Sequence, residues 1–396
     1  MDFELSSEDL MAIESLRRCV EAEVLPLIKG KCEKAFSPEL AHELMRILNP
    51  YGIGAGWLQE DGGGMGLSYM TSGLLYAELA RLAPDVAGMC YVSEGAAMRI
   101  YRRGTQEQKD RYLPGFASGR LIGCGAVTEP GTGSNVRQIQ TKAVRDGKGW
   151  RISGEKMFIS NATVADIATL LARTGENEYT FFIIDRSVHN FESREIDKLG
   201  LNGWSFGSIT LDDVYVGDEF RLGEEGKGLS EAMSGFERAR AWVAVICAGI
   251  ACAALEDSIS YAKERTQFGV PIAAHQMVQG LLAEMACETE ALQLLTYKAL
   301  ANLDKGGRCD LSTSMAKVYA SEAAIRITSK AIQIHGACGV TCEFPVERHF
   351  RNARMLTIPD GTTQINQLII GRELTGIPAF LGAGGLKKKE EKAAVA

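Results

Sequence analysis

The sequence predicts a mostly α-helical protein with a β domain at its centre. Apolar residues at helical spacing dominate residues 1–120, and short strand-like segments bounded by turn residues dominate residues 121–230. Long helical stretches then occupy residues 231–380, and long antiparallel helices favour a bundle. Residues 381–396, which combine a glycine cluster with a lysine–glutamate run, are predicted to form a disordered tail.

The first domain opens with a helix-start signal. Ser6 stands before acidic residues and is followed by Leu10, Ile13 and Leu16 at helical spacing. A second helical stretch runs from Ser68 to about Leu82. Residues 1–120 are therefore expected to be helical.

The pattern changes near Gly123. Strands are predicted at residues 149–154, 180–184 and 209–216, and helices at residues 231–264, 275–305 and 312–335. A helical domain, a β domain and a bundle in this order form an unusual signature. The order alone does not define a function.

Composition excludes several classes of protein. With 396 residues, 46% of them hydrophobic and 23% charged, the chain can bury a sizeable core in two or three domains. The net charge of -7 argues against nucleic acid as the principal partner, although a few local cations can still bind an anionic ligand.

The cysteines and the apolar runs indicate in which cellular compartment the protein is expected. The ten cysteines are scattered, mostly in apolar surroundings, which is typical of buried thiols in a reducing compartment and predicts no metal site. The acidic start of the chain does not resemble a targeting peptide. The longest apolar run, at about residues 241–255, is shorter than the ~20 residues that a membrane span needs. A cytoplasmic protein that does not engage a membrane is expected.

Four segments are candidates for chemistry, and each has an ordinary explanation when taken alone. They are GAVTEPGTGSN at 125–135, GEKMFISN at 154–161, ERTQFG at 264–269 with His275-Gln276, and RMLTIPDGTTQI at 354–365. The first could be a simple turn, and the second could carry a core aromatic in Phe158. Arg265 could interact favourably with the dipole at the C-terminal end of a helix, or it could bind a pyrophosphate. Asp360 could belong to a common Asp-Gly turn.

Together, in this order, the four segments resemble the acyl-CoA dehydrogenase family over about residues 1–380. Further matching stretches lie at 60–66, 104–108, 198–200, 235–240 and 333–339. The resemblance implies an N-terminal helical domain, a β-barrel-like middle domain and a C-terminal four-helix bundle. It also implies FAD between the β domain and the bundle, in a homo-oligomer that is usually a tetramer.

The resemblance implies site residues position by position. Those expected to hold FAD are Val127, Thr128, Phe158, Ser160, Thr362 and Gln364. Those expected to reach the FAD of a neighbouring subunit are Arg265, Phe268, Gln276, Gln333, Gly336 and Ala337. Those expected to contact the substrate are Ser134, Glu237, Arg240 and Gly361. Tyr91 and Glu94 are expected to shape or polarise the acyl pocket, unless they are simply packed or solvated helix positions.

The chain departs from the common family pattern at the base. Relatives usually have Tyr-Glu-Gly where this chain has Pro359-Asp360-Gly361, and the alternative position for a glutamate is occupied here by Ala239. The resemblance therefore implies that Asp360 removes the α proton of a CoA thioester while the β hydrogen passes as hydride to flavin N5. An electron-transfer flavoprotein would then accept the electrons.

An aspartate base is associated in the family with alicyclic substrates. Because aspartate is one methylene shorter than glutamate, either the α carbon lies closer to the loop or another atom is deprotonated. Cyclohexane-1-carboxyl-CoA, or another short acyl-CoA, is the expected substrate. Three alternatives stay open: an enoyl-CoA reductase, a nitroalkane-oxidase-like flavin oxidase, and a non-catalytic flavoprotein subunit.

Overall fold

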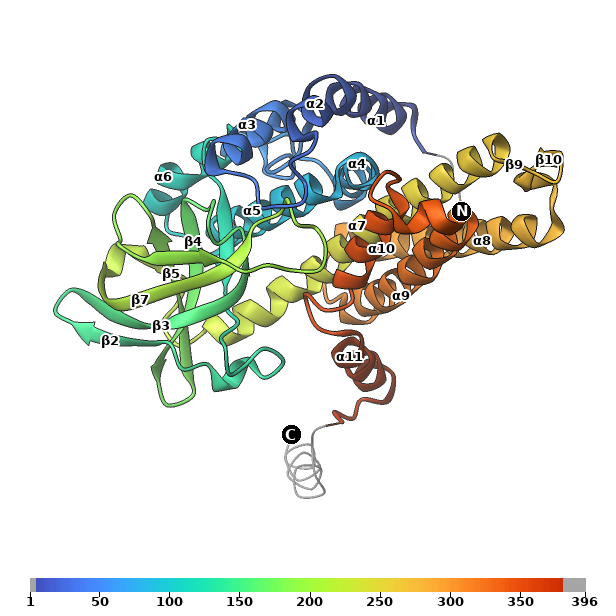
Figure 1. The fold of residues 1–396 in the computed structure, drawn as a ribbon. Coiled ribbons are helices and arrows are strands. Elements are labelled where there is room, and N and C mark those ends of the chain that lie inside the picture. Colours follow the sequence, from blue (N-terminus) through green and yellow to red (C-terminus); the bar gives the residue numbers. More distant parts are fainter. Residues whose placement is uncertain (1–4, 380–396) are drawn as a thin grey trace.

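The computed structural model describes residues 5–379 and contains helices, then a sheet, then helices again (Figure 1). The acidic N-terminal residues 1–4 and the predicted tail at 381–396 lie outside the described residues. The mostly helical fold with a central sheet, predicted from the sequence, is confirmed.

Helices form the first region. They are α1 (Ser7–Cys19), which continues through a π-helical turn at Val20–Val24, α2 (Leu25–Ile28), α3 (Pro38–Leu48), α4 (Tyr69–Leu82), α5 (Pro84–Arg103) and α6 (Gln106–Ala117). The predicted cap is present, because the Ser6 side chain accepts a hydrogen bond from the Asp9 amide at 3.0 Å. Ser68 caps α4 in the same way, by accepting from the Thr71 amide.

An eight-stranded sheet forms the second region. Its strands are β1 (Gly123–Ala126), β2 (Lys142–Asp146), β3 (Gly149–Ser160), β4 (Ile167–Gly175), β5 (Glu178–Asp185), β6 (Glu192–Glu195), β7 (Phe206–Gly217) and β8 (Arg221–Leu222). The order is β6-β7-β3-β2-β4-β5-β8, and β1 pairs with β4 in parallel. Two register shifts interrupt the β3–β7 pairing, and the second, between Lys156 and Ile159, spans Phe158.

Long helices form the third region. They are α7 (Gly228–Glu264), α8 (Gln276–Asp304), α9 (Asp310–His335), α10 (Val346–Met355) and α11 (Thr363–Thr375), and the short hairpin of β9 (Thr266–Gln267) and β10 (Val270–Pro271) connects α7 to α8. Helix α7 packs against α4, α8 and α9, while α10 and α11 pack on α9. With 37 residues, α7 is about 55 Å long and runs from the sheet to the far end of the bundle (Figure 1).

Helix α7 corrects one expectation from the sequence. The apolar run at 241–255 is too short to span a membrane, but the helix extends beyond it at both ends and is long and apolar enough by length and composition. The core helix of a soluble protein passes the same test, and 67% of the relevant stretch of α7 is buried inside the protein. The expected lack of a membrane partner therefore stays a prediction.

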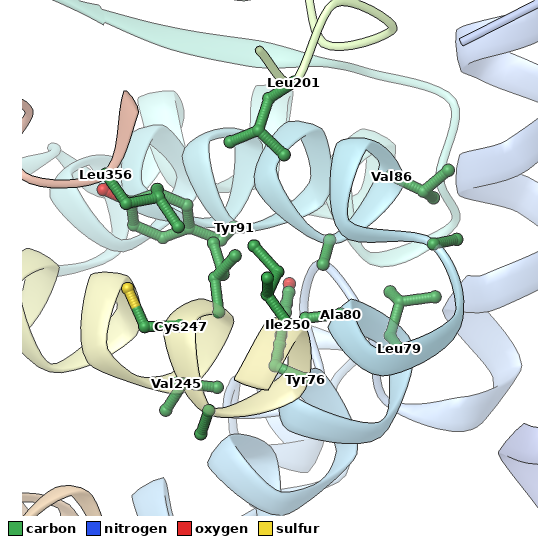
Figure 2. Close-up of a cluster of buried hydrophobic side chains, with 14 of the residues drawn as sticks. Tyr76, Leu79, Ala80, Val86, Tyr91, Leu201, Val245, Cys247, Ile250 and Leu356 are labelled. Atoms are coloured by element: carbon green, nitrogen blue, oxygen red, sulfur yellow. The ribbon is translucent and has the colours of Figure 1, made fainter. Parts of the chain in front are cut away.

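The largest core joins the first and third regions. Figure 2 shows part of this core, with side chains from α4, α5 and α7 gathered together with Leu201 and Leu356. Tyr76 of α4 and Tyr91 of α5 belong to this cluster. The α4–α5 pair and the start of the bundle therefore form one packed unit, which carries one wall of the site described below.

Helices α4 and α7 cross at very short range. A Cβ atom added at Gly249 of α7 would lie 2.5 Å from the Ala77 carbonyl oxygen and 2.6 Å from the Arg81 nitrogen, both in α4. Those neighbours are backbone atoms, so they cannot rotate away. Only a glycine permits this crossing.

We expect Gly249→Ala to destabilise the protein by about 1–3 kcal/mol, because an added methyl group forces the two helices apart. Urea unfolding of the holoprotein measures this as a lower midpoint. Gly280→Ala is the matched control: Gly280 lies in α8 with open space around its Cβ position. Alanine should be neutral there or stabilise by about 0.5–1 kcal/mol. Equal midpoints for both variants would contradict the close crossing.

Candidate active site

A cavity of about 780 Å³ lies between the sheet, α5, the first half of α7 and the loop before α11. Nine of the predicted site residues line it: Tyr91, Val127, Thr128, Ser134, Phe158, Ser160, Asp360, Gly361 and Thr362. These residues come from all three regions of the chain. The fold therefore brings together segments that are more than 200 positions apart in the sequence.

The loop that carries Asp360 has an unusual backbone. Asp360 has φ 54° and Gly361 has φ 92°, so both residues are left-handed, a conformation that is uncommon for a residue with a side chain. The Asn366 side chain holds the turn by donating to the carbonyl oxygens of Gly361 at 2.7 Å and Thr362 at 3.2 Å. Thr362 then caps α11. The turn is fixed by the start of the helix that follows it.

Opposing effects act on the carboxyl group of Asp360. Burial raises its pKa, while a hydrogen bond from the Tyr91 hydroxyl lowers it. The charges of Lys317 and Arg240 also lower this pKa. The group is thus half-buried and is stabilised as a carboxylate by groups from α5, α7 and α9.

Lys317 also supports this loop directly. Its fully buried ammonium group donates to the Thr357 carbonyl oxygen at 2.8 Å, three residues before Asp360. Burial lowers the pKa of Lys317 to about 8, against the charges of Asp360 and Glu322, which raise it. Lys317 therefore ties α9 to the loop and adds positive charge near the carboxylate.

The opposite wall of the cavity comes from the sheet. Phe158 has φ 60°, its side chain is 50% exposed, and its ring stacks on Phe206 with centroids 5.7 Å apart. Most other aromatic side chains of the described residues are buried or partly buried. An exposed aromatic ring on a strained backbone at the mouth of a cavity fits a flat aromatic ligand, such as the flavin ring that the resemblance implies.

A buried ion pair holds the loop beside Phe158. The Lys156 ammonium group donates to the Val127 carbonyl oxygen at 3.0 Å and to the Glu129 carboxylate at 2.8 Å. Burial lowers the pKa of Lys156 to about 8, and Glu129 raises it. Glu129 also accepts from the Thr141 amide at 2.9 Å. Val127 and Thr128 are therefore anchored where they line the cavity.

A second buried ion pair lies on the helical side. Glu94 of α5 accepts hydrogen bonds from Arg238 of α7 and, at 2.7 Å, from the Tyr76 hydroxyl. Burial raises the pKa of Glu94, whereas Arg238 lowers it. Arg238 lines the cavity, but Glu94 lies behind it. The structure therefore places the predicted pocket residue Glu94 one layer away from any ligand.

Three predicted residues lie outside the cavity lining. The Glu237 carboxylate accepts from the Cys309 amide, and Arg240 donates to Asp310 at 2.7 Å, so both hold α7 to the start of α9. Gln364 is exposed on α11. Their roles in binding substrate or cofactor stay predictions.

Another predicted group lies far from the cavity. Arg265, Phe268 and Gln276 lie at the hairpin end of α7, about 40 Å along the helix from Ala239, which lines the cavity. Figure 1 shows the β9–β10 hairpin at the opposite end of α7 from the sheet. Gln333, Gly336 and Ala337 are exposed at the end of α9. One chain does not bring these six residues to its own cavity.

Three buried cations have roles in the site that no sequence motif indicated. Lys156, Arg238 and Lys317 each lie inside segments considered from the sequence, yet none was predicted as a site residue. The sequence does contain a pattern that could have identified Lys317 as buried, because this lysine falls in an apolar stripe with Ala320 and Ala324 at helical spacing. A lysine in such a stripe must find a buried partner.

Metal chemistry finds no support in the described residues. Among residues 5–379, no three or more His, Cys, Asp or Glu side chains are grouped so that they could hold a metal ion. The ten cysteines are all free thiols, and six of them are buried.

Comparison with known proteins identifies the fold family. Models of the N-terminal, middle and C-terminal domains of acyl-CoA dehydrogenases match residues 6–120, 124–214 and 226–375. Together they span most of the chain. The acyl-CoA dehydrogenase fold predicted from the resemblance is thereby confirmed.

Two relatives are each 35% identical to this chain. One is the cyclohexane-1-carbonyl-CoA dehydrogenase of Geobacter metallireducens, over 94% of this chain and 98% of its own length. The other is subunit CarC of the caffeyl-CoA reductase–Etf complex of Acetobacterium woodii, over 92% of this chain and 97% of its own.

A solved structure of a similar protein supports FAD as the cofactor. The glutaryl-CoA dehydrogenase of Mycobacterium smegmatis, in complex with FADH2, superimposes with a TM-score of 0.89 at 31% identity, covering 95% of this chain and 97% of its own. The chain therefore belongs to the acyl-CoA dehydrogenase family, a family of FAD-binding oxidoreductases.

Proposed function

We propose that the protein desaturates a short or alicyclic acyl-CoA, with cyclohexane-1-carboxyl-CoA as the substrate, and that Asp360 removes the α proton. The observation that carries this proposal is the enclosed Asp360 carboxylate, hydrogen-bonded to Tyr91 in the cavity wall. Ala239, the alternative position for a base, also lines the cavity but has no titratable group. The relative from G. metallireducens supports the alicyclic substrate.

The environment of Asp360 suits a base that works near neutral pH. Burial raises its pKa and so makes the carboxylate a stronger proton acceptor. Tyr91 and Lys317 keep the charged form accessible. The left-handed turn presents the short side chain to the cavity, which compensates for part of the length that aspartate lacks.

The CoA part of the substrate would meet a basic wall. Six basic side chains line the cavity (Arg99, Arg102, Arg103, Lys198, Arg238 and Arg354), against two acidic ones (Glu231 and Asp360). The phosphates of CoA are anionic, so this imbalance favours binding even though the whole chain has a net charge of -7. Ser134 would contact CoA from the β1 side of the cavity.

Bound FAD would supply the acceptor for the β hydrogen. Val127, Thr128, Phe158 and Ser160 would hold its ring from the sheet, and Thr362 from the start of α11. Phe268, Met277 and Val340, all more than 70% exposed, lie near the hairpin end of the bundle. We propose that this apolar surface binds other copies of the chain in a tetramer, so that Arg265, Phe268, Gln276 and Gln333 reach the FAD of a neighbour.

The electron acceptor and location complete the proposal. An electron-transfer flavoprotein would take the electrons, and the A. woodii relative, which belongs to a reductase–Etf complex, supports this partner. The same relative favours a second candidate function, reduction of an enoyl-CoA. The ten free cysteines support a cytoplasmic location, where thiols stay reduced.

Replacing the base tests the proposal directly. We expect Asp360→Asn to slow flavin bleaching by cyclohexane-1-carboxyl-CoA, measured anaerobically by stopped flow, by on the order of 100- to 10,000-fold. Asp212→Asn, at an exposed strand position, should leave the rate unchanged. Wild-type rates for the Asp360 variant would refute the assignment. Faster bleaching by butyryl- or octanoyl-CoA than by the cyclohexane thioester would refute the alicyclic substrate.

Removing the Tyr91 hydroxyl should shift the pH profile. The hydrogen bond from Tyr91 lowers the pKa of Asp360, so Tyr91→Phe raises it and protonates more of the base at any given pH. The acidic limb of the flavin-reduction rate should therefore move to higher pH. Tyr101→Phe on the same helix is the control. An unmoved or oppositely moved limb would show that Tyr91 does not act on the base.

The proposed contact between subunits predicts a loss of FAD at a distance. Arg265→Ala should weaken FAD binding by on the order of 10- to 100-fold, because a charged donor to a phosphate is lost. The FAD-to-protein ratio after gel filtration and the mass by light scattering measure this. Arg18→Ala, in α1, is the control for a lost surface charge. A monomer that keeps one FAD per chain would overturn the intersubunit site.

A further inference from the structure

The wall of the acyl cavity contains a guanidinium group that the proposed reaction does not use. Arg238 lies on α7, one residue before Ala239, and lines the cavity although it is only 6% exposed. Burial raises the pKa of the nearby Tyr91 hydroxyl, the charge of Arg238 acts against that rise, and the same hydroxyl donates to Asp360. Arg238 therefore lies at the same end of the cavity as the base.

A chain of hydrogen bonds fixes Arg238 from behind. The Gly54 amide donates to the Tyr76 hydroxyl at 3.0 Å, this hydroxyl donates to Glu94 at 2.7 Å, and Glu94 accepts from Nη2 of Arg238. The guanidinium also lies 4.3 Å above the Trp242 ring. Its plane and position are thus set by residues of α4, α5 and α7, before any ligand binds.

The donors of Arg238 are largely unused. A guanidinium has five N–H donors, and within residues 5–379 Glu94 is the one acceptor bonded to Arg238. Its Nε atom is buried without an acceptor. A purely hydrocarbon acyl group would bury the remaining donors unpaired, which is unfavourable. Val92, Ala96, Val243 and Ile246, which also line the cavity, offer no side-chain acceptor.

The charge balance indicates which acceptor fits. Glu94 already supplies one negative charge to the guanidinium, and Asp360 adds another nearby. A carboxylate on the acyl group would compete with Glu94 for a guanidinium that already has its counter-charge. A hydroxyl or carbonyl oxygen would use the free donors without adding charge.

We propose that Arg238 is a specificity-determining residue that binds a hydroxyl or carbonyl oxygen on the acyl group, so that an oxygen-substituted short or alicyclic acyl-CoA binds more tightly than cyclohexane-1-carboxyl-CoA itself. This inference rests on the proposed function, because it takes the acyl group to occupy the space beside Asp360. It deepens that proposal by placing one polar group on an otherwise apolar substituent.

Matched thioesters test the inference. Binding of cyclohexane-1-carboxyl-CoA and of its ring-hydroxylated and ring-oxo analogues is measured by calorimetry on the FAD-loaded Asp360→Asn protein, which keeps turnover slow. An oxygen analogue should bind on the order of 10- to 100-fold more tightly than the unsubstituted ring, because it gains a hydrogen bond from a charged donor. Equal or weaker binding of every oxygen analogue overturns the inference.

Two further variants separate recognition from folding. Removing both partners of the pair, in Glu94→Gln with Arg238→Met, avoids an uncompensated buried charge and should abolish the preference. Glu94→Gln alone frees the cation from its counter-charge, so a carboxylate-bearing acyl-CoA should gain affinity relative to wild type. A preference that survives in the double variant overturns the role of Arg238.

The two proposals fail in different ways. If the unsubstituted ring bleaches the wild-type flavin and binds as well as its oxygen analogues, the dehydrogenase proposal stands and the role of Arg238 falls. If no acyl-CoA bleaches the flavin or binds, the proposed function falls and the inference falls with it.

Discussion

The carboxylate of Asp360, half-buried in the cavity wall, is the feature on which the site depends. Burial raises its pKa, while donors and cations at fixed positions oppose that rise and favour the charged form that a base needs. They come from Tyr91 on α5, Arg240 on α7 and Lys317 on α9. All three helices contribute to one packed core, in which the close crossing at Gly249 fixes how α7 approaches α4. Packing of these helices therefore positions the groups that act on the pKa of the base.

Helix α7 imposes a second constraint, which is geometric. Its first half lines the cavity, while its last residue leads into the hairpin with Arg265 and Phe268, tens of ångströms away. A straight helix cannot bring both ends to one ligand. If both ends hold FAD, they hold different molecules of FAD, and cofactor binding is coupled to assembly. The exposed Phe268 ring is consistent with such a surface, because an isolated subunit gains nothing from its exposure.

The sequence predicted the helices well where the hydrophobic periodicity extends over many residues, as in α7 to α9. It also predicted the N-cap of α1 at Ser6, which depends on neighbouring residues alone. It missed β4, whose continuous apolar run is buried on both faces and has no alternation to detect. For the site, motif order placed Asp360, Phe158 and Ser134 at one cavity. The partners of buried charges could not be predicted from the sequence. Glu94 and Arg238 are 144 positions apart, so no local sequence pattern links them.

The buried ion pair of Glu94 and Arg238 has an energetic cost that its own attraction does not obviously offset. Desolvating two charges costs several kcal/mol per ion, and apolar residues of similar volume often replace such pairs without loss of stability. A pocket that binds only hydrocarbon would therefore be more stable and more complementary with apolar side chains at both positions. This chain instead anchors the pair through Tyr76 and Gly54 and leaves guanidinium donors at the cavity. A ligand that supplies the missing acceptor satisfies these donors, so the pair links the packing of this wall to the chemistry of the acyl group.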